Sequence, residues 1–292
     1  MKVLTLGAAL AVVVTEVSTG IGYGTLHELI GAGYRVFGSV RKREDADRLS
    51  KEFGDAYVPL IFDVTDAAAV ARGVQAVRQA LGSDRLSGLV NNAGIAVLGP
   101  LLEMAVAEFR RQIEVNLVSI LTVTQAFFPL LRQAPDDGGR PARIVNISSV
   151  GGQFALPFLG PYAASKHGVE GLSDSLRREC MLHGVDVVVI DPATIATPMW
   201  KKGKDLDLSE YSKSPYHASM IRMKDTMAAY GRRGSPPELI GRRVVRILGA
   251  RRPKARYTSG NGKALIWLAR HLLSTRMVDR IIAKSLGLTG GA

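Results

Sequence analysis

The sequence is poor in cysteine, with Cys180 the only one among 292 residues. A single cysteine cannot form an internal disulfide, which excludes a disulfide-stapled secreted domain and favours a reducing, cytoplasmic location. We also find no apolar run that reaches the ~20 residues of a membrane-spanning helix. The apolar start, residues 1–14, has the look of a short signal peptide, but we favour a buried first strand over residues 10–14 because a glycine-containing loop follows.

Acidic residues are scarce toward the C-terminus. From residue 201 onward there are 20 lysines and arginines against 6 acidic residues, whereas the first 200 residues hold 18 against 20. A basic segment of this kind indicates an acidic partner, a lipid surface or nucleic acid, or simply a solvated face. It carries no recognised nucleic-acid motif and its charges alternate with apolar residues, so we do not predict nucleic-acid binding.

Apolar, β-branched segments alternate with segments of helical spacing along the chain. The predicted strands cover residues 11–15, 34–40, 58–62, 86–90, 143–147 and 185–190. The predicted helices cover residues 20–32, 43–53, 67–81, 105–132, 162–183 and 238–248. This order predicts a Rossmann-like α/β fold, a doubly wound parallel sheet with helices on both faces.

We expect one domain in three parts: a dinucleotide-binding and catalytic core (1–197), a substrate lid (198–236) and C-terminal helices (237–292). The stretch 194–236 contains prolines, glycines and lysines and is predicted to be irregular. Residues 263–286 have the spacing of two short amphipathic helices around Ser274. These helices could lie on an anionic membrane surface, on the lid or on a second subunit, and we favour packing against protein.

A glycine-containing loop joins the first strand to the first helix. Its sequence is Thr15-Glu16-Val17-Ser18-Thr19-Gly20-Ile21-Gly22. Glycines let the backbone approach a pyrophosphate, and the start of a helix offers free amide groups to it. Two glycines alone also make ordinary turns, but the strand before and the helix after favour nucleotide binding.

Tyr162 and Lys166 are four residues apart, which places both side chains on one helix face. A free tyrosine has a pKa of ~10, and a neighbouring ammonium would lower it toward a useful acid/base range. Ser149 lies 13 residues before Tyr162 at a strand end, where its hydroxyl could bind a substrate oxygen. Ser148 is the alternative for this role, and the spacing favours Ser149.

These motifs resemble those of the short-chain dehydrogenase/reductase family, over residues 12–197. The loop is similar to its TGxxxGxG motif, residues 91–94 match NNAG, and residues 191–197 resemble the PGxxxT turn. The similarity extends to hydroxysteroid and retinol dehydrogenases of the family. It implies an NAD(P)-dependent oxidoreductase that interconverts an alcohol and a ketone or aldehyde, and a homo-oligomer.

The resemblance also implies roles for individual residues. The catalytic group would be Asn116, Ser149, Tyr162 and Lys166, with Asn116 holding a water behind Lys166. The cofactor-binding residues would be Thr15, Ser18, Thr19, Gly20, Ile21, Gly22, Arg41, Asp63, Val64, Asn92, Ala93, Gly94, Tyr162, Lys166, Pro192, Ile195 and Thr197.

Two residues depart from the family pattern. Glu16 stands where the first glycine of the loop is expected, and Ala193 replaces the glycine of the PGxxxT turn. A carboxylate near the cofactor phosphates would repel them, and a side chain is unfavourable where the backbone turns sharply. Either Glu16 points to solvent, or cofactor binding is weakened or lost. The alternative function is therefore a non-catalytic binding protein on the same fold.

The second strand ends in Arg41 with no acidic residue to bind a ribose hydroxyl, which favours NADP over NAD. The other interpretation of Arg41 is a surface charge before a helix. The segment 149–158, with Met199, Trp200, Met220 and Met223, predicts a lipophilic alcohol or ketone substrate. The alternative is that Phe154 and Phe158 pack in a subunit interface or in the core. No histidines or acids lie at metal-ligand spacing, so no metal is predicted.

Overall fold

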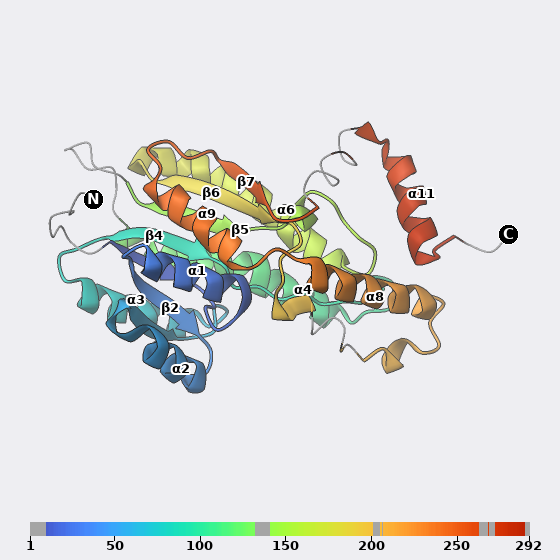
Figure 1. Ribbon diagram of the computed structural model, residues 1–292, viewed down its shortest axis with the longest axis horizontal. Coiled ribbons are helices and arrows are strands. Elements are labelled where there is room, and N and C mark those ends of the chain that lie inside the picture. The colour runs from blue at the N-terminus through green and yellow to red at the C-terminus, as the bar shows by residue number, and fades with distance from the viewer. Residues whose placement is uncertain are drawn as a thin grey trace.

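The computed structural model describes residues 10–131, 141–200, 205, 207–262, 268 and 272–289. Its centre is a parallel sheet of seven strands in the order β3-β2-β1-β4-β5-β6-β7 (Figure 1). The strands are β1 Ala11–Val14, β2 Arg35–Val40, β3 Tyr57–Ile61, β4 Leu86–Asn91, β5 Arg143–Ile147, β6 Asp186–Pro192 and β7 Arg256–Ser259. The predicted Rossmann-like fold is confirmed.

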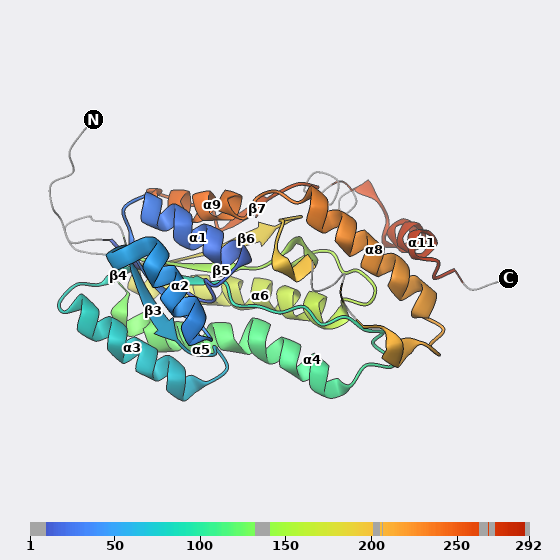
Figure 2. The ribbon, with the colours of Figure 1, turned by 60° about the horizontal axis from the view of Figure 1, so that its bottom comes forward.

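Helices cover both faces of the sheet, as Figure 2 shows for α1 and α9 on one side and α3, α4 and α5 on the other. Their bounds are α1 Gly20–Gly31, α2 Arg43–Phe53, α3 Ala67–Leu81, α4 Val106–Ile113, α5 Ser119–Phe127, α6 Gly160–Glu179 and α9 Glu238–Gly249. Leu26 of α1 and Val244 of α9 pack on the β1 and β6 valines of one face. Val74 of α3 and Phe127 of α5 fill the other face.

The helix predicted over residues 105–132 is interrupted. α4 passes into a π-helical turn, Glu114–Val118, before α5 begins. Such π turns commonly mark functional positions, and Asn116 lies inside this one. By length and composition alone the stretch Val106–Leu130 could cross a membrane. Because its residues Val123 and Phe127 are buried against the sheet, we interpret it as a core helix.

The prediction that residues 194–236 are irregular is wrong for the second half of this stretch. Residues His217–Arg233 form a long helix, α8. Met220, Met223 and Met227 recur at helical spacing and are buried in one cluster with Phe158 and Leu286. Periodic burial of unbranched side chains thus outweighs the local proline and glycine content.

The C-terminal part contributes a strand and a helix. β7 was not predicted, because its Arg256–Ser259 sequence is short, largely polar and partly exposed at the sheet edge. α11, Thr275–Leu286, begins where expected, with the Ser274 hydroxyl accepting a hydrogen bond from the Met277 amide. It lies beside α8 (Figure 1). Most of the first predicted tail helix, residues 263–267 and 269–271, lies outside the described residues.

Candidate active site

The loop after β1 has the geometry of a phosphate cradle. A Cβ added to Gly22 would lie only 1.9 Å from the Glu16 carbonyl oxygen, so only glycine fits there. Gly20 has a positive φ of 59°, which glycine adopts without strain. Thr19 occupies the N-cap position of α1, but its side chain makes no capping hydrogen bond. The first amides of α1 are therefore uncapped by this residue, and the loop fits a cofactor pyrophosphate.

Thr15 and Asn92 fasten this loop to the sheet. The Thr15 hydroxyl accepts hydrogen bonds from the amides of Asn92 (2.9 Å) and Ala93 (3.0 Å). The Asn92 side-chain amide donates to the carbonyls of Thr15 and Glu16, both at 3.0 Å. Because Thr15 is only 1% exposed, we assign it a positioning role rather than direct contact with a cofactor.

Glu16 does not point freely to solvent, which was the first of the two alternatives that the sequence left open. Its φ is +57°, and it shares a positive φ with only one other described non-glycine residue, Phe158. Its carboxylate accepts a hydrogen bond from the Ser18 hydroxyl and forms an ion pair with Arg41, whose Nε lies 3.3 Å away. The acid therefore neither points freely to solvent nor stands unpaired beside the cradle.

Asp63 and Val64 follow β3 at the same edge of the sheet. The Asp63 carboxylate accepts hydrogen bonds from the Thr65 amide (2.9 Å) and hydroxyl (2.7 Å). Burial acts to raise the pKa of Asp63, but the Thr65 hydrogen bonds and the Arg41 charge outweigh it and leave the pKa below its usual value. Asp63 thus stays ionised where the resemblance places the adenine ring. Val64 is buried.

Ser149, Tyr162 and Lys166 come together where β5 and α6 meet. Ser149 hydrogen-bonds the Tyr162 hydroxyl, and its own oxygen accepts from the Gly151 amide at 3.0 Å. The Lys166 ammonium lies 5.8 Å from the centre of the Tyr162 ring and donates to the Ile147 carbonyl at 2.8 Å. Ser148 instead faces the Lys166 backbone, which supports Ser149 as the serine beside the tyrosine.

Burial dominates the titration of this group. Burial raises the pKa of Tyr162, and the Ser149 hydrogen bond only partly opposes that rise. Burial also lowers the pKa of Lys166 to about 8, against the opposing charges of Glu170 and Asp191. The structure therefore does not show the expected lowering of the Tyr162 pKa by Lys166.

The Asn116 side chain forms hydrogen bonds with Ile95 and Ser165 rather than with Lys166. Its side-chain oxygen accepts from the Ile95 amide (2.8 Å), and its nitrogen donates to the Ile95 carbonyl (3.0 Å) and the Ser165 hydroxyl (3.1 Å). The π turn thus holds the segment after the NNAG motif against α6. A water held by Asn116 stays a prediction.

A buried acidic pair behind Lys166 was missed by sequence reasoning. Asp191, fully buried at the end of β6, accepts a hydrogen bond from the Gln153 amide at 2.7 Å. Arg256 of β7 pairs with Glu170 of α6 and lies 3.7 Å from Asp191. Burial, followed by the neighbouring Glu170, raises the pKa of Asp191 to about 8. Sequence spacing could not reveal this cluster, because its members come from four separate segments.

The turn after β6 lies against the glycine loop. A Cβ on Gly20 would meet the Thr197 Cβ at 3.5 Å, so the two loops are neighbours. Pro192 ends β6 and Ala193 is buried beside it. Ile195 is buried, and its carbonyl accepts a hydrogen bond from the Trp200 indole at 2.5 Å. The carbonyl of Ile195, a residue that the resemblance counts among the cofactor-binding ones, is therefore already bonded to a side chain.

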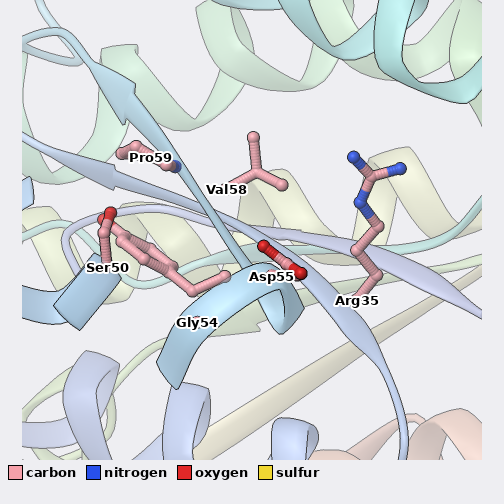
Figure 3. A pocket seen from close by; sticks show the side chains of 7 residues that line it. Arg35, Ser50, Gly54, Asp55, Val58 and Pro59 are labelled. Atoms are coloured by element: carbon pink, nitrogen blue, oxygen red, sulfur yellow. The ribbon is translucent and has the colours of Figure 1, made fainter. Parts of the chain in front are cut away.

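A surface depression at the other edge of the sheet is separate from this site. Figure 3 shows Arg35, Asp55 and Val58 around it, where β2 and β3 begin. The catalytic group lies at the carboxyl ends of the strands, whereas the depression lies where strands begin. The depression is therefore not the crevice in which a doubly wound sheet binds its ligand. Within the described ranges, no group of three or more histidine, cysteine or acidic residues could hold a metal.

Comparison with known proteins places these features in a family context. Residues 10–206 match the family model described as short chain dehydrogenase. The chain is 37% identical over 274 residues to the NADPH-dependent 3-dehydrocapnine reductase of Ornithobacterium rhinotracheale, covering 94% of this chain and 96% of that protein. It is 31% identical over 282 residues to retinol dehydrogenase 16 of Homo sapiens, covering 93% and 87%.

Two solved structures share the fold. A short-chain dehydrogenase from Streptomyces avermitilis has a TM-score of 0.74 and 22% identity, covering 98% of this chain and 100% of that one. A short chain dehydrogenase from Burkholderia cenocepacia in complex with NADP has a TM-score of 0.68 and 24% identity, covering 94% and 96%. At these identities the likeness concerns the fold alone.

Proposed function

Because the chain belongs to the short-chain dehydrogenase family, we propose that it interconverts a lipophilic alcohol and its ketone or aldehyde, with Tyr162 as the acid/base. The observation that carries the proposal is the meeting of Ser149, Tyr162 and Lys166 beside the turn that faces the phosphate cradle. A bound nicotinamide would supply or accept the hydride.

The chain's own residues would handle the proton. In the reducing direction, the Tyr162 hydroxyl donates its proton to the substrate oxygen as the carbonyl becomes an alcohol. Ser149, already hydrogen-bonded to that hydroxyl, donates to the same substrate oxygen and stabilises its developing charge. The Lys166 ammonium above the tyrosine ring stabilises the phenolate that remains. Oxidation runs the same steps in reverse.

Two observations support NADP as the cofactor. Arg41 is largely exposed at the end of β2, where its guanidinium could bind a 2′-phosphate. One relative is named as an NADPH-dependent reductase, and one similar structure was solved in complex with NADP. The pairing of Arg41 with Glu16 modifies this preference, as argued below.

A lipophilic substrate is supported by an apolar cluster that includes Phe158, from the segment between Ser149 and Tyr162. Phe158 packs with Met220 and Met223 of α8, and Trp200 lies against the same cluster. These side chains contain almost no polar groups, and methionine adapts its shape to irregular ligands. Phe158 is buried in this cluster, so it also packs as core, as the second interpretation of this segment expected.

Titration and turnover with the Tyr162→Phe variant test the proposal. NADPH and NADH binding is measured by fluorescence, and turnover with a panel of lipophilic ketones and alcohols. We expect Tyr162→Phe to lower kcat by about 10²–10⁴-fold and to change cofactor affinity by less than about twofold. Tyr230→Phe, which removes a half-exposed hydroxyl on α8, serves as the control and keeps its activity.

Two results would contradict the proposal. Full activity of Tyr162→Phe would exclude the acid/base role. Absence of NADPH and NADH binding at millimolar concentration would favour the alternative, a binding protein disabled by Glu16.

A further inference from the structure

We infer that the Glu16 carboxylate occupies the place of a cofactor 2′-phosphate, so that Glu16 sets the preference between NADP and NAD. The inference rests on the proposed function, because it concerns the cofactor of that site. It starts from an observation that the proposal does not use, namely the ion pair between Glu16 and Arg41.

The backbone of Glu16 is fixed on both sides. Its amide donates to the Ser39 hydroxyl at 2.9 Å, and its carbonyl accepts from the Asn92 side chain at 3.0 Å. Its carbonyl oxygen also lies directly against Gly22 of α1. With the main chain held in this way at a φ of +57°, the loop cannot carry the side chain away from the cradle.

The carboxylate itself makes the contacts that a phosphate would make. One oxygen accepts from the Ser18 hydroxyl, and the other lies 3.3 Å from the Arg41 Nε. A loop hydroxyl and a guanidinium from the end of β2 are groups that suit a phosphate ester. Glu16 therefore supplies an internal anion to donors of the kind that would bind the 2′-phosphate of NADP.

The acidic residues around Arg41 weaken its electrostatic attraction for a further anion. Arg41 also acts on Asp63, whose pKa it helps to lower. Arg48 of α2 donates to the Ser18 carbonyl at 2.8 Å and pairs with Asp45 at 3.1 Å. Both guanidiniums near the loop are thus matched by acids, so a 2′-phosphate must displace or adjoin a carboxylate.

The two cofactors differ in how they meet this carboxylate. A 2′-phosphate carries up to two negative charges and is repelled by Glu16. A ribose 2′-hydroxyl is a hydrogen-bond donor and could donate to the same oxygens. Glu16 should therefore weaken NADP binding more than NAD binding, while Arg41 acts in the opposite direction.

Equilibrium binding of adenosine nucleotides tests the inference without any turnover. The full chain is titrated calorimetrically with adenosine 2′,5′-bisphosphate and with 5′-AMP, at fixed ionic strength. The variants are Glu16→Gln, Arg41→Met and the double variant. Glu108→Gln is the control, because it removes an equally charged surface acid that pairs with Arg111 on α4.

We expect Glu16→Gln to raise the affinity for the bisphosphate by about tenfold relative to 5′-AMP. The control should leave this ratio unchanged. In the Arg41→Met background the same Glu16 change should still raise the ratio, because the carboxylate that repels the 2′-phosphate is removed there as well.

Three results would overturn the inference. An equal gain for both nucleotides would show general phosphate repulsion, and an unchanged ratio would show that Glu16 lies apart from the 2′ position. In either case the proposed function, turnover with Tyr162 as the acid/base, would be unaffected. Failure of every variant to bind either nucleotide, together with NADPH and NADH, would overturn the proposed function as well.

Discussion

Replacing Asp191 with asparagine tests whether the buried acid behind Lys166 is protonated in the folded chain. Burial, together with the neighbouring Glu170, raises the pKa of Asp191 to about 8. A free aspartate has a pKa of about 4. Between these values the folded chain holds a proton that the unfolded chain has released, so stability falls as pH rises from about 4 to 8.

The size of the effect follows from the width of this window. Each pH unit corresponds to about 1.4 kcal/mol, so the interval from pH 5 to pH 7.5 sets a ceiling of about 3 kcal/mol. Arg256, which is 41% exposed, brings solvent to the acid pair, and we expect about half of the ceiling. Lys166 has a pKa of about 8 and stays largely protonated over this interval, so it adds little slope.

Asparagine is a close substitute for the protonated acid. Its oxygen can still accept from Gln153, and its amide can donate to Glu170. At pH 5 we expect Asp191→Asn to match the unsubstituted chain within about 0.5 kcal/mol, and at pH 7.5 to exceed it by about 1–2 kcal/mol.

The assay is urea unfolding at pH 5, 6.25 and 7.5, at constant ionic strength and with comparison of midpoints and slopes. Asp279→Asn is the matched control, since this exposed acid of α11 gives the same change in charge. Parallel pH dependences of the Asp191 variant and the unsubstituted chain would refute the reasoning, because Asp191 would then be ionised in both states.

Two further changes probe stability at other points. Arg143→Met should lower the free energy of unfolding by about 2–4 kcal/mol. The reason is that this buried guanidinium donates to the carbonyls of Leu248 and Ala250, both at 2.5 Å, at the end of α9. A loss below about 0.5 kcal/mol in urea unfolding would contradict this expectation. Glu16→Gly should be about 1 kcal/mol more stable than Glu16→Ala, because both lack the carboxylate but only glycine adopts a φ of +57° without strain; equal unfolding midpoints would show that the loop relaxes.

The core of the fold was predictable because its strands are buried on both faces. Segments such as Val187–Ile190 are continuous runs of β-branched residues, which in a parallel sheet need no alternation. β7 lacks this signal, since a polar edge strand is specified by pairing with β6 rather than by its own composition. α8 was missed because its apolar stripe consists of methionines in a stretch rich in charge.

The same distinction holds in the candidate site. Ser149, Tyr162 and Lys166 could be predicted because local spacing on a strand end and a helix determines their meeting. The position of Glu16 could not, since it depends on Arg41, which reaches the loop from the next strand. Sequence reasoning found the unusual residue from its departure from the motif but not its partner.

The state of Asp191 bears directly on the proposed chemistry. If Asp191 is protonated near neutral pH, its charge no longer stabilises the Lys166 ammonium, in a site whose burial already lowers the pKa of Lys166. If Asp191 is ionised, the ammonium is held more firmly and stabilises the Tyr162 phenolate more strongly. The unfolding experiment therefore distinguishes two charge states of the catalytic group, since a flat difference between the asparagine variant and the unsubstituted chain can arise only from the second.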